Sequence, residues 1–249
     1  EQIDIHAGGE DLIFPHHENE IAQSEAANGK DFAKYWMHNG FLNIDNRKMS
    51  KSLGNFFTVR EISEKYDLQV LRFFMLSAHY RSPLNFSAEL MEAAGNGLDR
   101  IVTAAGNLKF LMENTKAEKM TEAEAELFGQ TDQFKENFEK AMDDDFNTAD
   151  AIAAIFDYVK FINTNTDGNS SKEFLEKLHD RLTKLSDVLG IIVDREEEML
   201  DADIEAMIEE RQAARKNRDF ARADQIRADL LAKGIVLEDT REGVKWRRA

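Results

Sequence analysis

The feature that most constrains this 249-residue chain is a series of long amphipathic segments between residues 88 and 190. Apolar residues recur there every three or four positions, which places them on one face of a helix. The clearest runs are Leu98, Ile101, Val102, Ala105 and Leu108, followed by Ala151, Ile152, Ile155, Phe156 and Val159. Three or four such segments in succession predict an antiparallel helical bundle whose helices bury their apolar faces against one another.

The regions on either side of the bundle have different patterns. Residues 1 to about 60 alternate short apolar runs with glycine turns, as in an α/β segment, and residues 58–87 continue in a helical pattern that Pro83 closes. The acidic residues 194–210 indicate a solvated linker running into a helix. A basic helical stretch and a hairpin, GIVLEDTREGVKW, follow. We therefore expect a mainly α protein with an α/β N-terminal segment and a small α+β C-terminal domain.

Charge is distributed unevenly along the chain. The formal net charge of −16 disfavours non-specific binding to polyanions, so we expect no DNA partner. Residues 211–249 nevertheless carry eight arginines and three lysines against six acids, a local charge of +5 that leaves −21 on the rest. No apolar run approaches the roughly 20 residues of a membrane span, and the first residues lack a signal-peptide pattern. We expect a cytoplasmic protein without a membrane partner.

Two lysines lie in a glycine-containing segment, NRKMSKSLGN, residues 46–55. Lys48 and Lys51 sit among small residues, and Gly54 gives the backbone freedom, which suits a mobile loop that closes over a polyphosphate. A basic surface loop is the plainer interpretation. The string from Lys48 to Ser52, however, resembles the signature loop of class I aminoacyl-tRNA synthetases letter for letter.

A second motif, FPHHENEIAQSEA at residues 14–26, offers metal ligands in a chain that contains no cysteine. His16 and Glu20 are at i and i+4 and so share one helix face, where imidazole and carboxylate suit zinc. His17, at i and i+3 to Glu20, is an alternative ligand. Zinc needs three or four ligands and this motif shows two, so a surface His–Glu pair is the competing interpretation.

The stretch DIHAGGEDLIFPHHENEIAQSEA, with YWMHNGFLNIDNRKMSKSLGNFFTVREI, MDDDFNTADAIAAIF and the C-terminal WRR, resembles the cysteinyl-tRNA synthetase family. The resemblance implies ATP-dependent ligation of L-cysteine to its tRNA. It assigns residues 1–57 to the end of a Rossmann-like class I catalytic domain and 58–95 to a stem-contact region. It also assigns 96–193 to a tRNA-binding bundle and 194–249 to an anticodon-recognition domain.

The same resemblance implies roles for individual residues. Zinc would be held by His16 and Glu20 together with two cysteines from an earlier part of the protein, and ATP would enter with Mg²⁺. The adenylate would lie against His6, Gly8, Gly9 and Asp11, with Lys51 and Lys48 as the catalytic lysines. Because the chain opens on Glu1 and we find no His-Ile-Gly-His motif, we expect a fragment that is inactive alone.

The basic C-terminal region has two interpretations. Spacings of four, three and four would line up four arginines on one continuous helix, as a phosphate or base-edge contact strip: Arg211, Arg215, Arg218 and Arg222. The family register instead selects Arg215, Asp224 and Asp239 as base contacts. Both hold only if the helix breaks near residues 217–219, with Asp219 capping a second helix. Trp246 could stack on a base or pack on the hairpin against Ile235 or Leu237.

Other functions remain open at this point. The cysteine ligase of mycothiol synthesis resembles the same core but lacks an anticodon-reading tail, and a non-catalytic tRNA-binding module is a further alternative. His79, Tyr80 and Arg81 lie where the family meets the inner corner of the tRNA. Packing of an aromatic residue beside a surface arginine explains these three residues equally well.

Overall fold

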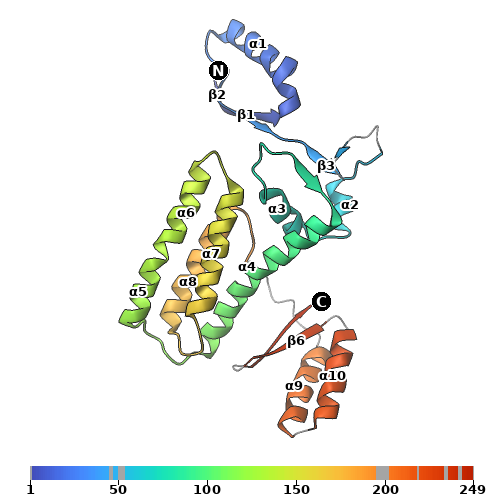
Figure 1. Cartoon of the computed structure of the whole chain (residues 1–249), viewed down its shortest axis with the longest axis vertical. Coiled ribbons are helices and arrows are strands. Elements are labelled where there is room, and N and C mark those ends of the chain that lie inside the picture. Colours follow the sequence, from blue (N-terminus) through green and yellow to red (C-terminus); the bar gives the residue numbers. More distant parts are fainter. Residues whose placement is uncertain are drawn as a thin grey trace. The chain divides into compact units, whose positions relative to one another are not determined.

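The computed structural model describes residues 2–44, 47–49, 54–194, 202–217, 219–232, 235–240 and 243–248 (Figure 1). The chain divides into two compact units, Glu1–Asp194 and Arg195–Ala249. Helices dominate both units, as the sequence predicted. The finer division into four domains stays a prediction.

The N-terminal segment is a parallel strand pair with a helical crossover. β1 (Ile3–Gly9) pairs in parallel with β2 (Ala33–Asn39). The connection contains η1 (Glu10–Leu12), η2 (Ile13–His17) and α1 (Glu18–Asn28), and it is helical because parallel strands need a long crossover. Gly29 ends α1 with a φ of 64°, a left-handed conformation that glycine adopts without steric cost.

A second small sheet joins residues that are far apart in the sequence. Its order is β4 (Arg47–Lys48), β3 (Leu42–Ile44) and β5 (Leu84–Phe86), with β3 and β5 parallel. Between the strands lie α2 (Val59–Ser63) and α3 (Leu68–Leu76). The sequence predicted only helix over 58–87, and β5 corrects this. Its three residues become a strand because β3, a long-range partner, supplies the hydrogen bonds.

Five helices form the bundle in the fully described stretch 88–188, one or two more than predicted. They are α4 (Ala88–Asn114), α5 (Glu122–Gln130), α6 (Asp132–Asp143), α7 (Thr148–Asn165) and α8 (Lys172–Val188). The predicted apolar faces of α4 and α7 form the core, since Leu98, Ile101 and Ile155 are fully buried. Phe174 and Leu178 of α8 complete this core, which extends to Phe73 and Phe74 of α3.

The C-terminal unit is a helical hairpin followed by a β-hairpin. α9 (Ala202–Lys216) ends where the sequence allowed a break, and α10 (Phe220–Ala232) begins after Asp219, whose carboxylate accepts the Arg222 backbone N–H. β6 (Ile235–Thr240) pairs antiparallel with β7 (Gly243–Arg248), which confirms the predicted hairpin. Leu230 and Ile235 are buried in this unit's own core. Among the described helices, none has the length and apolar character to cross a membrane.

One carboxylate holds the ends of two bundle helices. Glu124 forms a capping box with Thr121 at the start of α5, and it also accepts the backbone N–H and the hydroxyl of Ser171 at 2.7 and 2.9 Å. Ser171 in turn caps α8. Burial alone would raise the pKa of Glu124, but the hydrogen bonds from Thr121 and Ser171 outweigh it and lower the pKa below 4.5.

We predict that Glu124→Gln lowers the free energy of unfolding by about 1–3 kcal/mol, because the amide nitrogen cannot accept these hydrogen bonds. As the pH falls, Glu124 binds a proton at a higher pH in the unfolded chain than in the folded protein. The contribution of Glu124 is therefore complete above pH 4.5 and is lost as the pH falls through the folded-state pKa. Urea unfolding at pH 7 and pH 3.5 measures both effects. Glu126→Gln, at an exposed position of the same helix, is the control, and an equal loss in both variants would contradict the capping role.

Candidate metal centre

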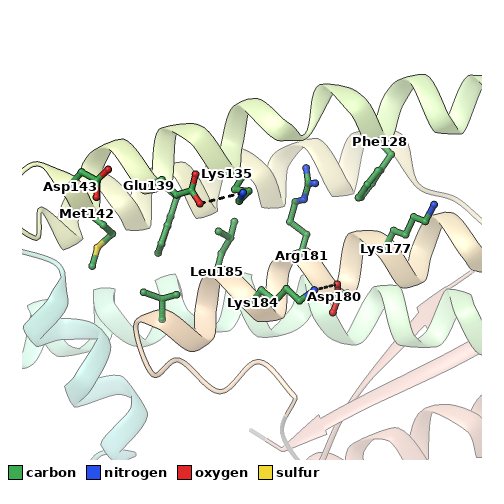
Figure 2. A pocket seen from close by; sticks show the side chains of 12 residues that line it. Phe128, Lys135, Glu139, Met142, Asp143, Lys177, Asp180, Arg181, Lys184 and Leu185 are labelled. Atoms are coloured by element: carbon green, nitrogen blue, oxygen red, sulfur yellow. Dashed lines mark hydrogen bonds and ion pairs between the residues drawn. The ribbon is translucent and has the colours of Figure 1, made fainter.

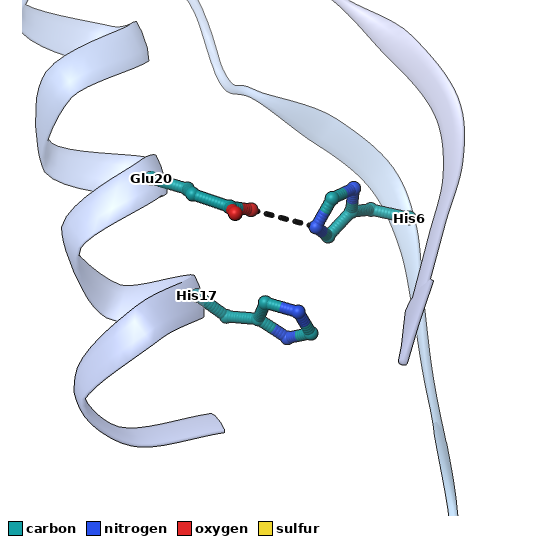
Figure 3. Close-up of side chains that lie close together, drawn as sticks. All are labelled: His6, His17 and Glu20. Carbon is teal, nitrogen blue, oxygen red and sulfur yellow. Dashed lines mark ion pairs between the residues drawn. The ribbon is translucent and has the colours of Figure 1, made fainter. Parts of the chain in front are cut away.

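The candidate metal centre lies on one face of the β1–β2 pair. Side chains alternate along a strand, so His6 and Gly8 of β1 share a face. The parallel register sets Trp36 beside His6 and His38 beside Gly8. The crossover then brings η2 and α1 back over this face, so that His17 of η2 and Glu20 of α1 lie near His6 (Figure 3).

His6, His17 and Glu20 form a group that could hold a metal ion. Their ligand atoms all lie within 4.8 Å of one another. The Nε2 atom of His6 is 2.7 Å from an oxygen of Glu20, the distance of an ion pair (Figure 3). The two groups are not aligned for a hydrogen bond, and this buried nitrogen has no hydrogen-bond partner among the described residues. A buried imidazole nitrogen without such a partner is suited to bind a cation.

A second histidine orients His17. The Nδ1 atom of His17 lies 2.8 Å from Nε2 of His38, so one of the two nitrogens donates and the other accepts. If Nδ1 of His17 donates, its Nε2 has a lone pair available for a metal. Zinc-binding histidines commonly donate their other ring N–H to an outer-shell partner in this way. Burial lowers the pKa of His38, and the charges of His17 and His6 lower it further. His38 therefore binds a proton less readily than an ordinary histidine.

Close packing leaves room for His17 only because residue 8 is glycine. A Cβ atom on Gly8 would lie 2.9 Å from Cε1 and 3.2 Å from Nε2 of the His17 ring. His17 is accordingly buried. Trp36 lies edge-on to His6 at 4.8 Å between ring centroids and stacks beside His38 at 6.1 Å. Trp36 thus contacts two of the histidine rings of this cluster.

The donor set fits zinc. Two imidazoles and one carboxylate are a known set for zinc sites that keep an open position. Two ligands about 2.0 Å from a tetrahedral zinc are about 3.3 Å apart. The present separations, from 2.7 Å to at most 4.8 Å, bracket that value and need only small side-chain movements.

Of the predicted ligands, the structure groups Glu20 and the alternative His17 with His6 of β1. His16 lies outside this group. The residues up to His17 form a π-helix and α1 begins only at Glu18, so the regular α-helical spacing that we assumed from Pro15 onward starts late. His16 is exposed, and its role as a ligand stays a prediction. His38 was missed, although its i, i+2 spacing from Trp36 in a strand was a usable signal.

The other residues predicted near the nucleotide have different outcomes. Gly9 follows His6 and Gly8 on β1, and a Cβ atom there would lie 2.6 Å from Oδ1 of Asp11, so glycine admits this carboxylate. Lys48 lies in β4, and the description does not extend to its side chain. Lys51 lies outside the described residues. The roles of these residues stay predictions.

The anticodon residues lie in the C-terminal unit. Arg215 of α9 and Asp224 of α10 are exposed, and the helix break between them removes the conflict in their spacing. The strip of four arginines on one helix is wrong, because α9 ends at Lys216 and Arg211 is 3% exposed. Asp239 lies in β6 and Trp246 in β7, where Trp246 stands opposite Leu237.

A groove of about 720 Å³ lies elsewhere, between α6 and α8 of the bundle (Figure 2). Its floor is apolar and includes Phe138 and Leu185. Lysines and carboxylates on its rim pair with each other, as Lys135 does with Glu139 at 3.3 Å and Lys184 with Asp180 at 2.7 Å. These pairs reduce its attraction for a charged ligand, so volume alone does not make it a site.

Comparison with known proteins places three family models along the chain. The "tRNA synthetases class I (C) catalytic domain" matches residues 1–96, the "DALR domain" residues 137–193, and the "Cysteinyl-tRNA ligase anticodon binding domain" residues 197–247. Curated relatives named cysteine–tRNA ligase include that of Lachnospira eligens, 67% identical over 249 residues, and that of Clostridioides difficile, 56% identical over 248. The chain is covered completely, and it spans about half (53%) the length of each relative.

Solved structures show the same fold at low sequence identity. The LeuRS–tRNA–LeuAMS complex of Agrobacterium radiobacter is 18% identical with a TM-score of 0.60, covering 74% of this chain and 25% of that one. Methionyl-tRNA synthetase of Mycobacterium tuberculosis, solved with methionyl-adenylate, is 19% identical with a TM-score of 0.51, covering 76% and 40%. Both likenesses concern the fold alone.

The histidine cluster predicts a pH-dependent signal from Trp36. The chain contains two tryptophans, so Trp246→Phe leaves Trp36 as its reporter. Because the folded-state pKa of His38 is lowered, the unfolded state binds this proton first, and the local structure loses stability as the pH falls below 6.5. We expect Trp36 emission to change with a midpoint below 6.5, and His38→Asn to remove most of the change.

The control for this titration is His16→Ala, at an exposed position outside the cluster. It should leave the titration of Trp36 in place. An unaltered curve in the His38→Asn variant, or a midpoint at the ordinary histidine value, would show that His38 does not control the signal.

Proposed function

Because the chain belongs to the cysteinyl-tRNA synthetase family, we propose that it takes part in the ATP-dependent ligation of L-cysteine to tRNA(Cys) through a cysteinyl-adenylate. The observation that carries this proposal is the meeting of His6, His17 and Glu20 beside the Gly8–Gly9 end of β1. Metal-binding donors thus lie next to the glycine end of β1, where the missing side chains leave room for the His17 ring and the Asp11 carboxylate.

Zinc is the metal that we propose for the amino-acid end of the site. A zinc ion held there would supply an open position for the substrate thiol, and the hard hydroxyl of serine could not replace that bond. Glu20 supplies the negative charge and His6 a buried nitrogen that needs a partner. The position of His17 makes it the third donor in this group. The family register would assign that role to His16.

At the nucleotide end, we assign binding of the adenylate to the turn after β1. Gly8 and Gly9 let the backbone approach the ligand, and the Asp11 carboxylate can accept hydrogen bonds from ribose hydroxyls. Lys51 and Lys48 would neutralise the charge that develops as pyrophosphate leaves, with Mg²⁺ entering bound to ATP. Both lysines would act as cations toward the phosphates.

We assign recognition of the tRNA anticodon to the C-terminal unit. Arg215 and Asp224 are exposed side chains on two different helices, and such a pair can read base edges from two directions. Asp239 and Trp246 on the hairpin complete the proposed set. The match of residues 197–247 to an anticodon-binding model favours this function over the cysteine ligase of mycothiol synthesis.

We predict that Glu20→Ala in the intact enzyme removes zinc and cysteine activation together. Loss of a ligand should weaken zinc binding by more than the roughly 10- to 100-fold that loss of an outer-shell partner costs. Zinc content and cysteine-dependent exchange of pyrophosphate into ATP are the measurements. Glu18→Ala, at an exposed position on the same helix, is the control. Full zinc with normal exchange in Glu20→Ala would refute the assignment.

The matched variants His16→Ala and His17→Ala decide between the two adjacent histidines. The family register predicts that His16→Ala loses zinc. The grouping of His17 with His6 and Glu20 predicts instead that His17→Ala loses it. Retention of zinc in both variants would remove this segment from the site.

For the anticodon, we predict that Arg215→Ala or Asp239→Ala raises the Michaelis constant for tRNA and leaves pyrophosphate exchange intact. A lost base contact costs about 1–3 kcal/mol, which corresponds to roughly 5- to 150-fold. Charging assays on the intact enzyme measure the change, with the exposed Arg227→Ala as a control on α10. Unchanged tRNA kinetics in both variants would argue against these contacts.

A further inference from the structure

The turn between α6 and α7 is held by the segment that joins α3 to β5. The Tyr80 hydroxyl donates to Oδ1 of Asp145 at 2.8 Å, and the Arg81 guanidinium lies 3.0 Å from the other oxygen of that carboxylate. Nε2 of His79 is 3.9 Å from the same oxygen. Asp145 therefore lies within ion-pair or hydrogen-bond distance of all three residues of one short segment.

The backbone angles of the turn between α6 and α7 indicate that its conformation depends on these contacts. Asp145 and Phe146 both have positive φ angles, 55° and 54°. Two consecutive residues other than glycine in the left-handed region persist only where their surroundings hold them. Here the Asp145 carboxylate is held on one side of the turn. On the other side, the Thr148 hydroxyl donates a 2.8 Å hydrogen bond to the Leu76 carbonyl.

The opposite side of the same segment holds the end of β2. The Tyr80 carbonyl accepts the backbone N–H of Gly40 at 2.8 Å. A Cβ atom on Gly40 would lie 2.6 Å from the backbone of Ser82, so the two chains approach closely only with glycine there. Gly40 lies two residues after His38 of the metal centre and directly precedes the β3–β4 hairpin that contains Lys48.

We propose that Tyr80 and Asp145 are positioning residues that couple the helical bundle to the metal centre and to the β3–β4 hairpin that contains Lys48. The hydroxyl of Tyr80 holds the bundle turn, and its carbonyl holds Gly40 between the two catalytic motifs. The inference rests on the proposed function. In the intact enzyme, the contact would set the geometry of the activation site through the bundle without touching a substrate.

The protonation of Tyr80 agrees with this role. Burial raises its pKa, and the hydrogen bond and charge of Asp145 raise it further, so the hydroxyl stays a donor. Arg81 opposes the shift but keeps Asp145 in place. Although 63% of the Arg81 side chain is exposed, its guanidinium faces this carboxylate, which favours a link within the protein over a contact with RNA phosphate.

The test is a double-mutant cycle in the intact enzyme, with Tyr80→Phe, Asp145→Ala and both together. We expect the kcat of cysteine-dependent pyrophosphate exchange to fall about 3- to 10-fold in each single variant, with the KM for cysteine unchanged. The double variant should be no worse than Asp145→Ala alone, because that variant already removes the contact with Tyr80. Asp145→Asn keeps an acceptor for Tyr80 and tolerates positive φ, so it should restore most of the rate.

The control is Tyr158→Phe, which removes a buried hydroxyl bonded to the Leu178 carbonyl inside the same bundle. It should lower stability without changing kcat. A fall in kcat for Tyr158→Phe as large as that for Tyr80→Phe would mean that stability alone is measured. Additive losses in the double variant, or unchanged kcat in both single variants, would overturn the inference.

Amide hydrogen exchange of this chain separates the inference from the proposed function. Tyr80→Phe and Asp145→Ala should accelerate exchange at Gly40 about 3- to 10-fold, whether or not the chain ligates cysteine. Tyr158→Phe should not change it. Faster exchange with no pyrophosphate exchange in the unaltered enzyme would reject the proposed function alone, whereas unchanged exchange at Gly40 would reject the coupling.

Discussion

The parallel pairing of β1 with β2 sets the spacing of the candidate metal centre. Its register places His6 beside Trp36 and Gly8 beside His38. The crossover that parallel strands require returns α1 over the same face and delivers His17 and Glu20. A shift of one residue would turn His6 to the opposite face and separate the donors. The chemistry of this end of the protein thus depends on backbone hydrogen bonds more than on any single side chain.

Backbone hydrogen bonds also help to form the junction between this N-terminal segment and the bundle. The three-residue strand β5 pairs with β3, and the segment before it contacts Gly40 on one side and Asp145 on the other. These hydrogen bonds add to apolar packing. The buried core of the bundle also contains Phe73 and Phe74 of α3, and Leu42 of β3 and Leu84 of β5 pack against it.

Much of this could be predicted from the sequence because it depends on local pattern. The helical period around Leu98 and Ile155 gave the bundle, and Asp219 marked the start of α10. β5 could not be predicted, because three residues become a strand only through a distant partner. That His17 lies with His6 and Glu20 depends on the π-helix that ends at His17 and on the space above Gly8, neither of which spacing reveals. The segment around Lys51 was identified from its sequence motif alone, because Lys51 lies outside the described residues.

The most direct test of the metal centre is to observe its imidazole nitrogens. The chain has six histidines, and ¹⁵N-resolved NMR of their rings during a Zn²⁺ titration reports which nitrogens bind. The account predicts that the Nε2 resonances of His6 and His17 shift together at stoichiometric zinc, while those of His79 and His179 do not. Bound zinc with unchanged His6 and His17 resonances would contradict it.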